Sequence, residues 1–333
     1  MSKRTSRIGV VGGGLGGLAA ACTLAARGHA VTLFERNPWL GGKAAVLEQD
    51  GFRFDMGPTI LIMPSVLRRI FAEAGRDLDK ALELVPLDPQ WRCFFADGSR
   101  LDLLQDDGAM AGKLEAFAPG SGEQYRRFME LSGRLHRISD DYFLWKSVGS
   151  ITDTFNLGDT FSPAVLQDLL AMGMGRTVSG TVRKHFKDPR VAQLVDHFIQ
   201  YVGSSPEASP AVLCGIAHMQ TGEGVWYPMG GTRAVPEALI RLATDLGVEL
   251  CPGTGVERIL VEGDRVSGVK TSDGETVPLG AVVSNMDAVR TYRELVGGPV
   301  GERYRKRDFE PACSGVVLYL GLERAYDHLE HHN

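Results

Sequence analysis

The sequence predicts an α/β fold in which two distant parts of the chain contribute to one parallel sheet. Residues 7–11, 15–27 and 30–35 alternate as buried strand, helix and buried strand, and such β-α-β units imply parallel pairing. Strand and helix signals of the same kind return between residues 234 and 284. The intervening residues 91–201 begin as alternating antiparallel strands and continue as helices, which is a different pattern.

The glycine pattern Gly12-x-Gly14-x-x-Gly17 lies between the first strand and the first helix. Gly12 allows a tight turn, Gly14 allows backbone to approach a pyrophosphate, and Gly17 allows close helix–strand packing. The helix N-terminus offers N–H groups and about half a positive charge to phosphates. Glu35 ends the second strand, where its carboxylate can accept hydrogen bonds from a ribose diol. Together these features predict a Rossmann-like dinucleotide-binding domain.

The remaining elements follow from turn residues and apolar spacing. Asp50-Gly51 indicates a small hairpin, and Gly247 is typical of a helix C-terminus. We expect helices at residues 64–74, 121 onward and 234–246, and strands at 91–95, 99–103, 248–250, 256–261, 266–270, 281–284 and 314–321.

Composition limits the class of protein. A length of 333 residues suggests about two domains, and 41 glycines indicate many tight turns or close backbone approaches. The net charge of −5 provides no bulk positive field, so we expect no nucleic-acid partner. The 5 cysteines include no CxxC pair, which favours neither a disulfide framework nor a zinc ribbon and indicates a reducing, cytoplasmic compartment.

One early segment imitates a signal peptide or membrane span. Residues 8–26 carry no charge and follow Lys3, Arg4 and Arg7. The glycines at positions 12–14, 16 and 17 would each cost a helix about 1 kcal/mol relative to alanine, so we favour the nucleotide-binding interpretation.

Further motifs resemble one family. Gly41-Gly42-Lys43 and Phe54-Asp55-Met56-Gly57-Pro58-Thr59 follow Glu35 in order, and later segments match at Val225–Gly231, Val256–Ile259 and Ala281–Ala288. These motifs resemble the flavin-containing amine oxidase and phytoene desaturase superfamily, in particular the bacterial and fungal type of phytoene or diapophytoene desaturase. The resemblance covers essentially the whole chain and is strongest to the diapophytoene branch.

The resemblance implies FAD as cofactor and a Rossmann-like FAD-binding domain of the amine-oxidase type with an inserted α+β substrate domain. The expected FAD-binding segments are 1–90 and 225–295. Residues 91–224 are expected to form a mostly helical domain that faces substrate and membrane, to which residues 296–333 return. The cofactor-binding residues that it implies are Gly12, Gly14, Leu15, Gly16, Gly17, Glu35, Arg36, Gly42, Lys43, Gly57, Pro58, Thr59 and Val256.

The implied reaction is FAD-dependent desaturation of a linear carotenoid precursor, phytoene (C40) or 4,4'-diapophytoene (C30), with oxygen or a quinone as electron acceptor. FAD would take a hydride from an allylic carbon while a proton leaves the neighbouring carbon. We assign no catalytic residue, because Asp140 and Asp141 are interpreted as a solvated helix face. Trp226 and Tyr227 fit either a flavin-adjacent tunnel or core packing.

Two other functions are open. The first is another oxidoreductase of the superfamily: a carotenoid end-group oxygenase, a hydroxysqualene dehydroxylase, a retinoid saturase or an amine oxidase. The second is a non-catalytic escort protein that binds isoprenoid chains without flavin. The intact Gly12, Gly14, Gly17, Glu35 and Gly42 argue against the second.

A lipid-soluble polyene substrate implies contact with a membrane. Residues 161–180 are apolar and are followed by Arg183, Lys184 and Lys187, a pattern typical of an interfacial helix. We therefore expect a peripheral protein at the inner face of the membrane. A core helix with a basic end is the alternative.

Two expectations concern the C-terminal part of the chain. His328, His331 and His332 have the spacing of ligands on one helical face, but a loop fits better, and we predict no metal site. Family members are longer and return to the FAD domain with a further Gly-rich segment. The resemblance therefore implies that this chain is C-terminally truncated and lacks part of its cofactor site.

Overall fold

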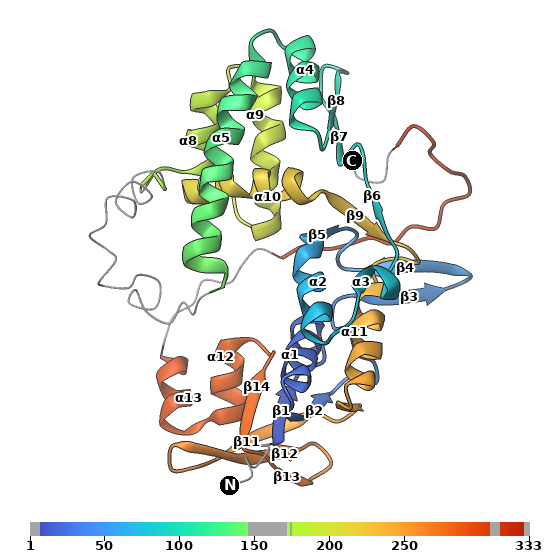
Figure 1. The fold of residues 1–333 in the computed structure, drawn as a ribbon, viewed down its shortest axis with the longest axis vertical. Coiled ribbons are helices and arrows are strands. Elements are labelled where there is room, and N and C mark those ends of the chain that lie inside the picture. Colours follow the sequence, from blue (N-terminus) through green and yellow to red (C-terminus); the bar gives the residue numbers. More distant parts are fainter. Residues whose placement is uncertain (1–6, 146–171, 174, 307–313, 330–333) are drawn as a thin grey trace. The chain divides into compact units, whose positions relative to one another are not determined.

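The computed structural model describes residues 7–145, 172–173, 175–306 and 314–329, whose helices and strands are labelled in Figure 1. By its internal contacts the chain divides into two compact units. The first combines Met1–Val85 with Trp226–Glu310, and the second combines Pro86–Val225 with Pro311–Asn333. The functions predicted for the domains stay predictions.

The first unit is built around a four-stranded sheet in the order β10-β2-β1-β14, in which every neighbouring pair is parallel. Figure 1 labels β2, β1 and β14 of this sheet. Its strands are β1 (Arg7–Val11), β2 (Ala30–Glu35), β10 (Glu249–Pro252) and β14 (Ala281–Ser284). The outer strands β10 and β14 come from the second segment of the unit, so the sheet requires both parts of the chain. The predicted α/β class is confirmed.

Helix α1 (Leu15–Ala26) packs on this sheet, and helices from both segments pack with it in one hydrophobic cluster. They are α2 (Pro64–Glu73), α3 (Leu78–Ala81) and α11 (Ala234–Asp245). Leu18 of α1 and Leu33 of β2 are fully buried in one hydrophobic cluster, which also contains Leu239 and Leu242 of α11. Burial of this apolar surface, at about 25 cal/mol per Å², fixes α1 against the sheet and thereby fixes the loop that precedes α1.

Antiparallel strands complete the first unit. The predicted hairpin is formed by β3 (Ala45–Gln49) and β4 (Phe52–Met56), and a second antiparallel sheet has the order β11-β12-β13. A small sheet has the order β5-β9-β6. The bounds are β5 (Leu61–Ile62), β6 (Leu84–Pro86), β9 (Val225–Pro228), β11 (Val256–Glu262), β12 (Arg265–Thr271) and β13 (Thr276–Pro278), followed by α12 (Ala288–Arg290), a π-helical turn η4 (Thr291–Val296) and α13 (Gly298–Arg305).

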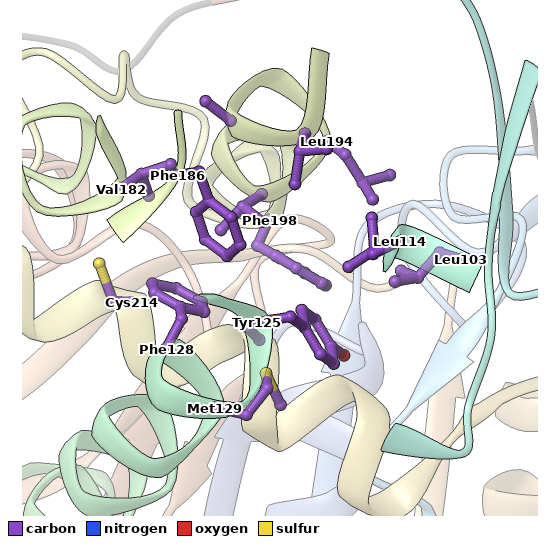
Figure 2. Close-up of a cluster of buried hydrophobic side chains, with 14 of the residues drawn as sticks. Leu103, Leu114, Tyr125, Phe128, Met129, Val182, Phe186, Leu194, Phe198 and Cys214 are labelled. Atoms are coloured by element: carbon purple, nitrogen blue, oxygen red, sulfur yellow. The ribbon is translucent and has the colours of Figure 1, made fainter. Parts of the chain in front are cut away.

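The second unit packs helices against a short hairpin of β7 (Trp91–Phe94) and β8 (Arg100–Leu103). Its helices are α4 (Asp107–Phe117), α5 (Ser121–Ser139) with the π-helical turn η1 (Asp140–Leu144), α8 (Val178–His185), α9 (Pro189–Asp196), η2 (His197–Val202), η3 (Ala211–Cys214) and α10 (Gly215–Glu223). Figure 2 shows the core that joins them, where Tyr125 and Phe128 of α5 lie among Leu114, Phe186 and Phe198.

The strand predicted at residues 314–321 is wrong. The structure gives these residues no regular hydrogen-bonded conformation, and Val316 and Leu318 are 92% and 75% exposed. An apolar run forms a strand only when a neighbouring strand satisfies its backbone groups. Within the described residues this segment pairs with no strand.

The predicted interfacial segment 161–180 falls mostly outside the described residues, and its last residues begin α8. Arg183 of α8 pairs with Asp196 at 2.7 Å, whereas Arg176 and Lys184 line a cavity of about 460 Å³ together with Leu131 and Leu135. In the part of the chain that the structure describes, no helix combines the length and the apolarity that crossing a membrane requires.

Asp188 is expected to contribute to stability as the N-cap of α9. Its carboxylate accepts hydrogen bonds from Arg190 N and Val191 N, and the Arg190 side chain lowers the pKa of this carboxyl. Asp188→Ala should destabilise the protein by about 1 kcal/mol at neutral pH. The measurement is urea unfolding followed by circular dichroism.

The pH dependence has a definite sign. Because folding lowers the pKa of Asp188, its contribution is present above the ordinary aspartate pKa and is lost as pH falls through the lower folded value. Asp188→Ser keeps a capping acceptor but loses the ion pair with Arg190, so most of the stability should return without this pH dependence. Equal stability of all three proteins at every pH would refute the prediction.

Candidate functional site

The loop that follows β1 is shaped to receive an anion. Gly12 has φ +97° and donates its N–H to Phe34 O at 2.8 Å, which turns the chain toward α1. Helix α1 begins after Gly14, and no side chain caps its N-terminus. The first N–H groups of a helix have no intrahelical partner, so this end of α1 offers donors and partial positive charge to a phosphate.

Glu35 ends β2, as the sequence predicts, and its side chain is positioned by the same loop. Its carboxylate is buried, with only 8% of the residue exposed, and it accepts hydrogen bonds from Gly13 N at 2.7 Å and Asn37 N at 2.9 Å. Each carboxylate oxygen has a further lone pair, which leaves capacity for the hydroxyls of a ribose.

The Gly41-Gly42 segment crosses the first glycine loop. Gly41 N donates to Gly13 O at 2.8 Å, and Gly14 and Gly41 form an isolated parallel bridge. A Cβ atom on Gly42 would lie 2.9 Å from Gly14 Cα, and Gly42 has φ +60°. Only glycine permits this crossing without displacing backbone, and the crossing brings Lys43 to the phosphate-binding loop.

These loops enclose a cavity of about 760 Å³, which lies within the range typical of ligand sites. Of the predicted cofactor-binding residues, the cavity is lined by Gly12, Gly14, Leu15, Glu35, Arg36, Gly42, Lys43, Pro58 and Val256. Gly16, Gly17, Gly57 and Thr59 do not line it. Gly17 acts instead in packing, because a Cβ atom there would lie 1.9 Å from Gly12 O.

The cavity also contains residues to which sequence reasoning assigned no role. Asn285 follows β14, lines the cavity and donates from Nδ2 to Gly12 O at 3.4 Å. Arg290 and Glu294 line it as an ion pair at 2.8 Å, and the Arg290 guanidinium lowers the pKa of Glu294 through its hydrogen bonds. Ligands in open α/β sheets bind at the carboxyl ends of the strands, and this rule could have identified Asn285.

Other sequence candidates lie elsewhere. Asp140 and Asp141 are exposed, with Asp141 paired to Arg137 at 3.4 Å, which confirms the interpretation as a solvated helix face. Trp226 and Tyr227 lie on β9 and do not line the cavity. His331 and His332 lie outside the described residues, and in the part that is described no three His, Cys, Asp or Glu side chains gather as metal ligands.

The cavity has the features that a dinucleotide requires: unpaired helix N–H groups, an acidic group at the end of β2, and the cations Arg36 and Lys43 on its wall. At the crossing, Gly14 and Gly42 bring backbone to the cavity wall without a side chain of their own, which fits a cofactor held by backbone. The residues present therefore fit FAD.

Comparison with known proteins agrees with this geometry. The family model described as flavin-containing amine oxidoreductase matches residues 15–302. A 4,4'-diapolycopene oxygenase of Methylomonas sp is 36% identical over 100% of this chain and 66% of its own length. A zeta-carotene-forming phytoene desaturase of Myxococcus xanthus is 37% identical over 100% of this chain and 63% of its own. This chain therefore spans about two thirds of the length of these relatives.

A solved structure has the same fold. Wild-type putrescine oxidase bound to putrescine aligns with a TM-score of 0.61 at 15% identity, over 90% of this chain and 62% of the oxidase chain. At this identity the likeness concerns the fold alone, and it agrees with the parallel sheet and the loops described above.

Proposed function

The chain belongs to the family of flavin-containing amine oxidoreductases, with FAD as its cofactor, and on that premise we propose that it desaturates a linear carotenoid precursor such as phytoene or 4,4'-diapophytoene. The observation that carries the proposal is the match along the whole chain to two enzymes named for carotenoid chemistry. The cavity in the first unit supports it, because its lining residues fit the FAD that such a reaction requires.

The residues of the cavity have separate tasks in this proposal. The N-terminus of α1 holds the pyrophosphate, and Glu35 holds the ribose diol. Arg36 and Lys43 provide positive charge on the wall of the cavity. The bound cofactor would supply a hydride acceptor for an allylic carbon of the polyene, with a proton lost from the neighbouring carbon.

In this proposal the chain binds FAD and the polyene and excludes water from them, and it supplies no nucleophile. No residue of the structure is assigned as the base for the departing proton, and the exposed Asp140 and Asp141 are poor candidates because water screens them. We further propose that the second unit holds the polyene and that the protein receives it at a membrane surface. Arg176 and Lys184, which line one cavity together with Leu131 and Leu135, support such a contact.

A second function is favoured by one specific observation. The Methylomonas relative is named an oxygenase of a C30 carotenoid, and its identity to this chain is 36% against 37% for the desaturase. Oxidation at an end group of a carotenoid is therefore the alternative to desaturation within the same site.

Product analysis distinguishes the two functions. The protein, loaded with FAD, should be incubated with phytoene, with 4,4'-diapophytoene and with 4,4'-diapolycopene, and the products separated and identified by absorption and mass. Desaturation predicts products that lose pairs of hydrogen atoms and absorb at longer wavelength. Products that gain oxygen instead support the alternative. An absence of both, with flavin bound, would refute the proposal.

A further inference from the structure

A short turn before α11 contacts both loops that shape one wall of the cavity. The turn comprises residues 230–233, between β9 and α11. Arg233 directs Nη1 at two backbone carbonyls, Leu40 O at 2.5 Å and Ala44 O at 3.3 Å. These two carbonyls flank the Gly41-Gly42-Lys43 segment, the crossing loop. One guanidinium therefore holds both ends of this loop.

The residue before Arg233 holds the second loop. Thr232 N donates to Asp55 Oδ2 at 2.8 Å, and Thr232 Oγ1 donates to Pro58 O at 2.7 Å. The turn that contains Asp55 and Pro58 packs directly on the crossing loop, because a Cβ atom on Gly57 would lie 2.6 Å from Lys43 O. Two consecutive residues therefore connect the second segment of the unit to both loops.

The crossing loop needs such support. Gly41 and Gly42 have φ +111° and +60°, and glycine loses more conformational freedom on ordering than any other residue. Arg233 has a mostly buried side chain, 19% exposed, and it also pairs with Glu237 at 3.4 Å, which limits its movement. A hydrogen bond from a charged donor to a carbonyl is stronger than one between neutral groups.

We propose that Arg233 and Thr232 are positioning residues that hold the Gly41–Lys43 loop ready for FAD. Neither residue lines the cavity, so both act through the loops that they hold. The proposal rests on the assignment of this cavity as the FAD site. Without these contacts the loop must be ordered when the cofactor binds, and this cost lowers the affinity.

The test compares two arginines of the same helix region. Arg241 of α11 donates to Ala81 O at 3.1 Å, away from the cavity, and is the matched control. In the 333-residue chain without FAD, hydrogen exchange measured by mass spectrometry should be faster at residues 40–45 in Arg233→Ala than in wild type. Arg241→Ala should leave that peptide unchanged. FAD titration followed by flavin fluorescence should show about tenfold weaker binding for Arg233→Ala, equivalent to ~1.4 kcal/mol.

Two conservative substitutions of Thr232 test the loop that contains Asp55 and Pro58. Thr232→Val removes the hydroxyl donor at constant volume and should speed exchange at residues 55–59, whereas Thr232→Ser keeps the donor and should not. If Arg233 and Thr232 only stabilised the fold, their substitution would lower the thermal unfolding midpoint of the first unit. The faster hydrogen exchange would then not be confined to residues 40–45 and 55–59.

The outcomes separate the proposal from the site assignment. If FAD at millimolar concentration protects residues 12–17 and 40–45 in wild type, but Arg233→Ala binds FAD equally well, the proposal fails and the site assignment stands. If FAD protects neither peptide in wild type, the site assignment fails and the proposal with it. Unchanged exchange at residues 40–45 in Arg233→Ala would also overturn the proposal.

Discussion

Replacing Gly17 by alanine should abolish measurable FAD binding. The new Cβ atom would lie 1.9 Å from Gly12 O. Gly12 O is a backbone atom and the Cβ atom is fixed by its bond to the backbone, so neither can turn aside as the end of a long side chain does. Either α1 or the glycine loop must shift, which displaces the N–H groups that hold the pyrophosphate. Overpacking of this kind costs about 1–3 kcal/mol of stability. The measurements are FAD titration by fluorescence and urea unfolding.

Gly112→Ala is the matched control for this substitution. Gly112 lies inside α4, and a Cβ atom there would meet no atom within 4 Å. Alanine is the better helix former, so this variant should gain up to about 1 kcal/mol and leave FAD binding unchanged. Gly17→Ala with wild-type affinity for FAD would show that close packing of α1 on the loop is not required.

Replacing Glu35 by glutamine is expected to weaken FAD binding by roughly 100-fold. The carboxylate accepts two backbone N–H groups, from Gly13 and Asn37, and an amide can accept only at its one oxygen. Its NH₂ group would face a backbone N–H donor, which costs about 1–3 kcal/mol and disturbs the loop, and one of the two acceptor oxygens for the ribose diol is lost as well. Isothermal titration with FAD measures the effect.

Glu249→Gln provides the control for the loss of a carboxylate. Glu249 begins β10 of the same sheet and pairs with Arg7 at 2.5 Å on the surface, with 57% of its side chain exposed. An exposed ion pair contributes little, so this variant should bind FAD as wild type does. Equal affinity of Glu35→Gln and Glu249→Gln would contradict the role given to Glu35.

The sequence predicts those parts of the cavity that depend on neighbours along the chain. Gly12, Gly14 and Glu35 belong to one β-α-β unit, and each is required by local geometry, so their positions in the site follow from the motif alone. The crossing of Gly42 over Gly14 depends on the path of the loop between them. The family resemblance implied that Gly42 binds the cofactor, but it did not indicate this crossing.

Contacts between distant segments could not be predicted in the same way. Arg233 contacts a loop of the cavity wall and Asn285 lines the cavity, because α11 and β14 pack beside α1 and β1. No local sequence pattern contains this relation. For residues 314–321, in contrast, the sequence predicts an element that the structure does not contain. Its apolar residues predict a strand, but a strand also needs a partner, which it lacks among the described residues.

The central claim is that the cavity between the Gly12–Gly17 loop and the Gly41–Lys43 loop holds FAD. Backbone amide NMR of the isotopically labelled protein tests it most directly, because chemical shifts report weak as well as tight binding residue by residue. On addition of FAD to millimolar concentration, we expect saturable shifts of the Gly13, Gly14, Gly41 and Gly42 amides. Shifts confined to other parts of the chain, or no shifts at all in the folded protein, would contradict it.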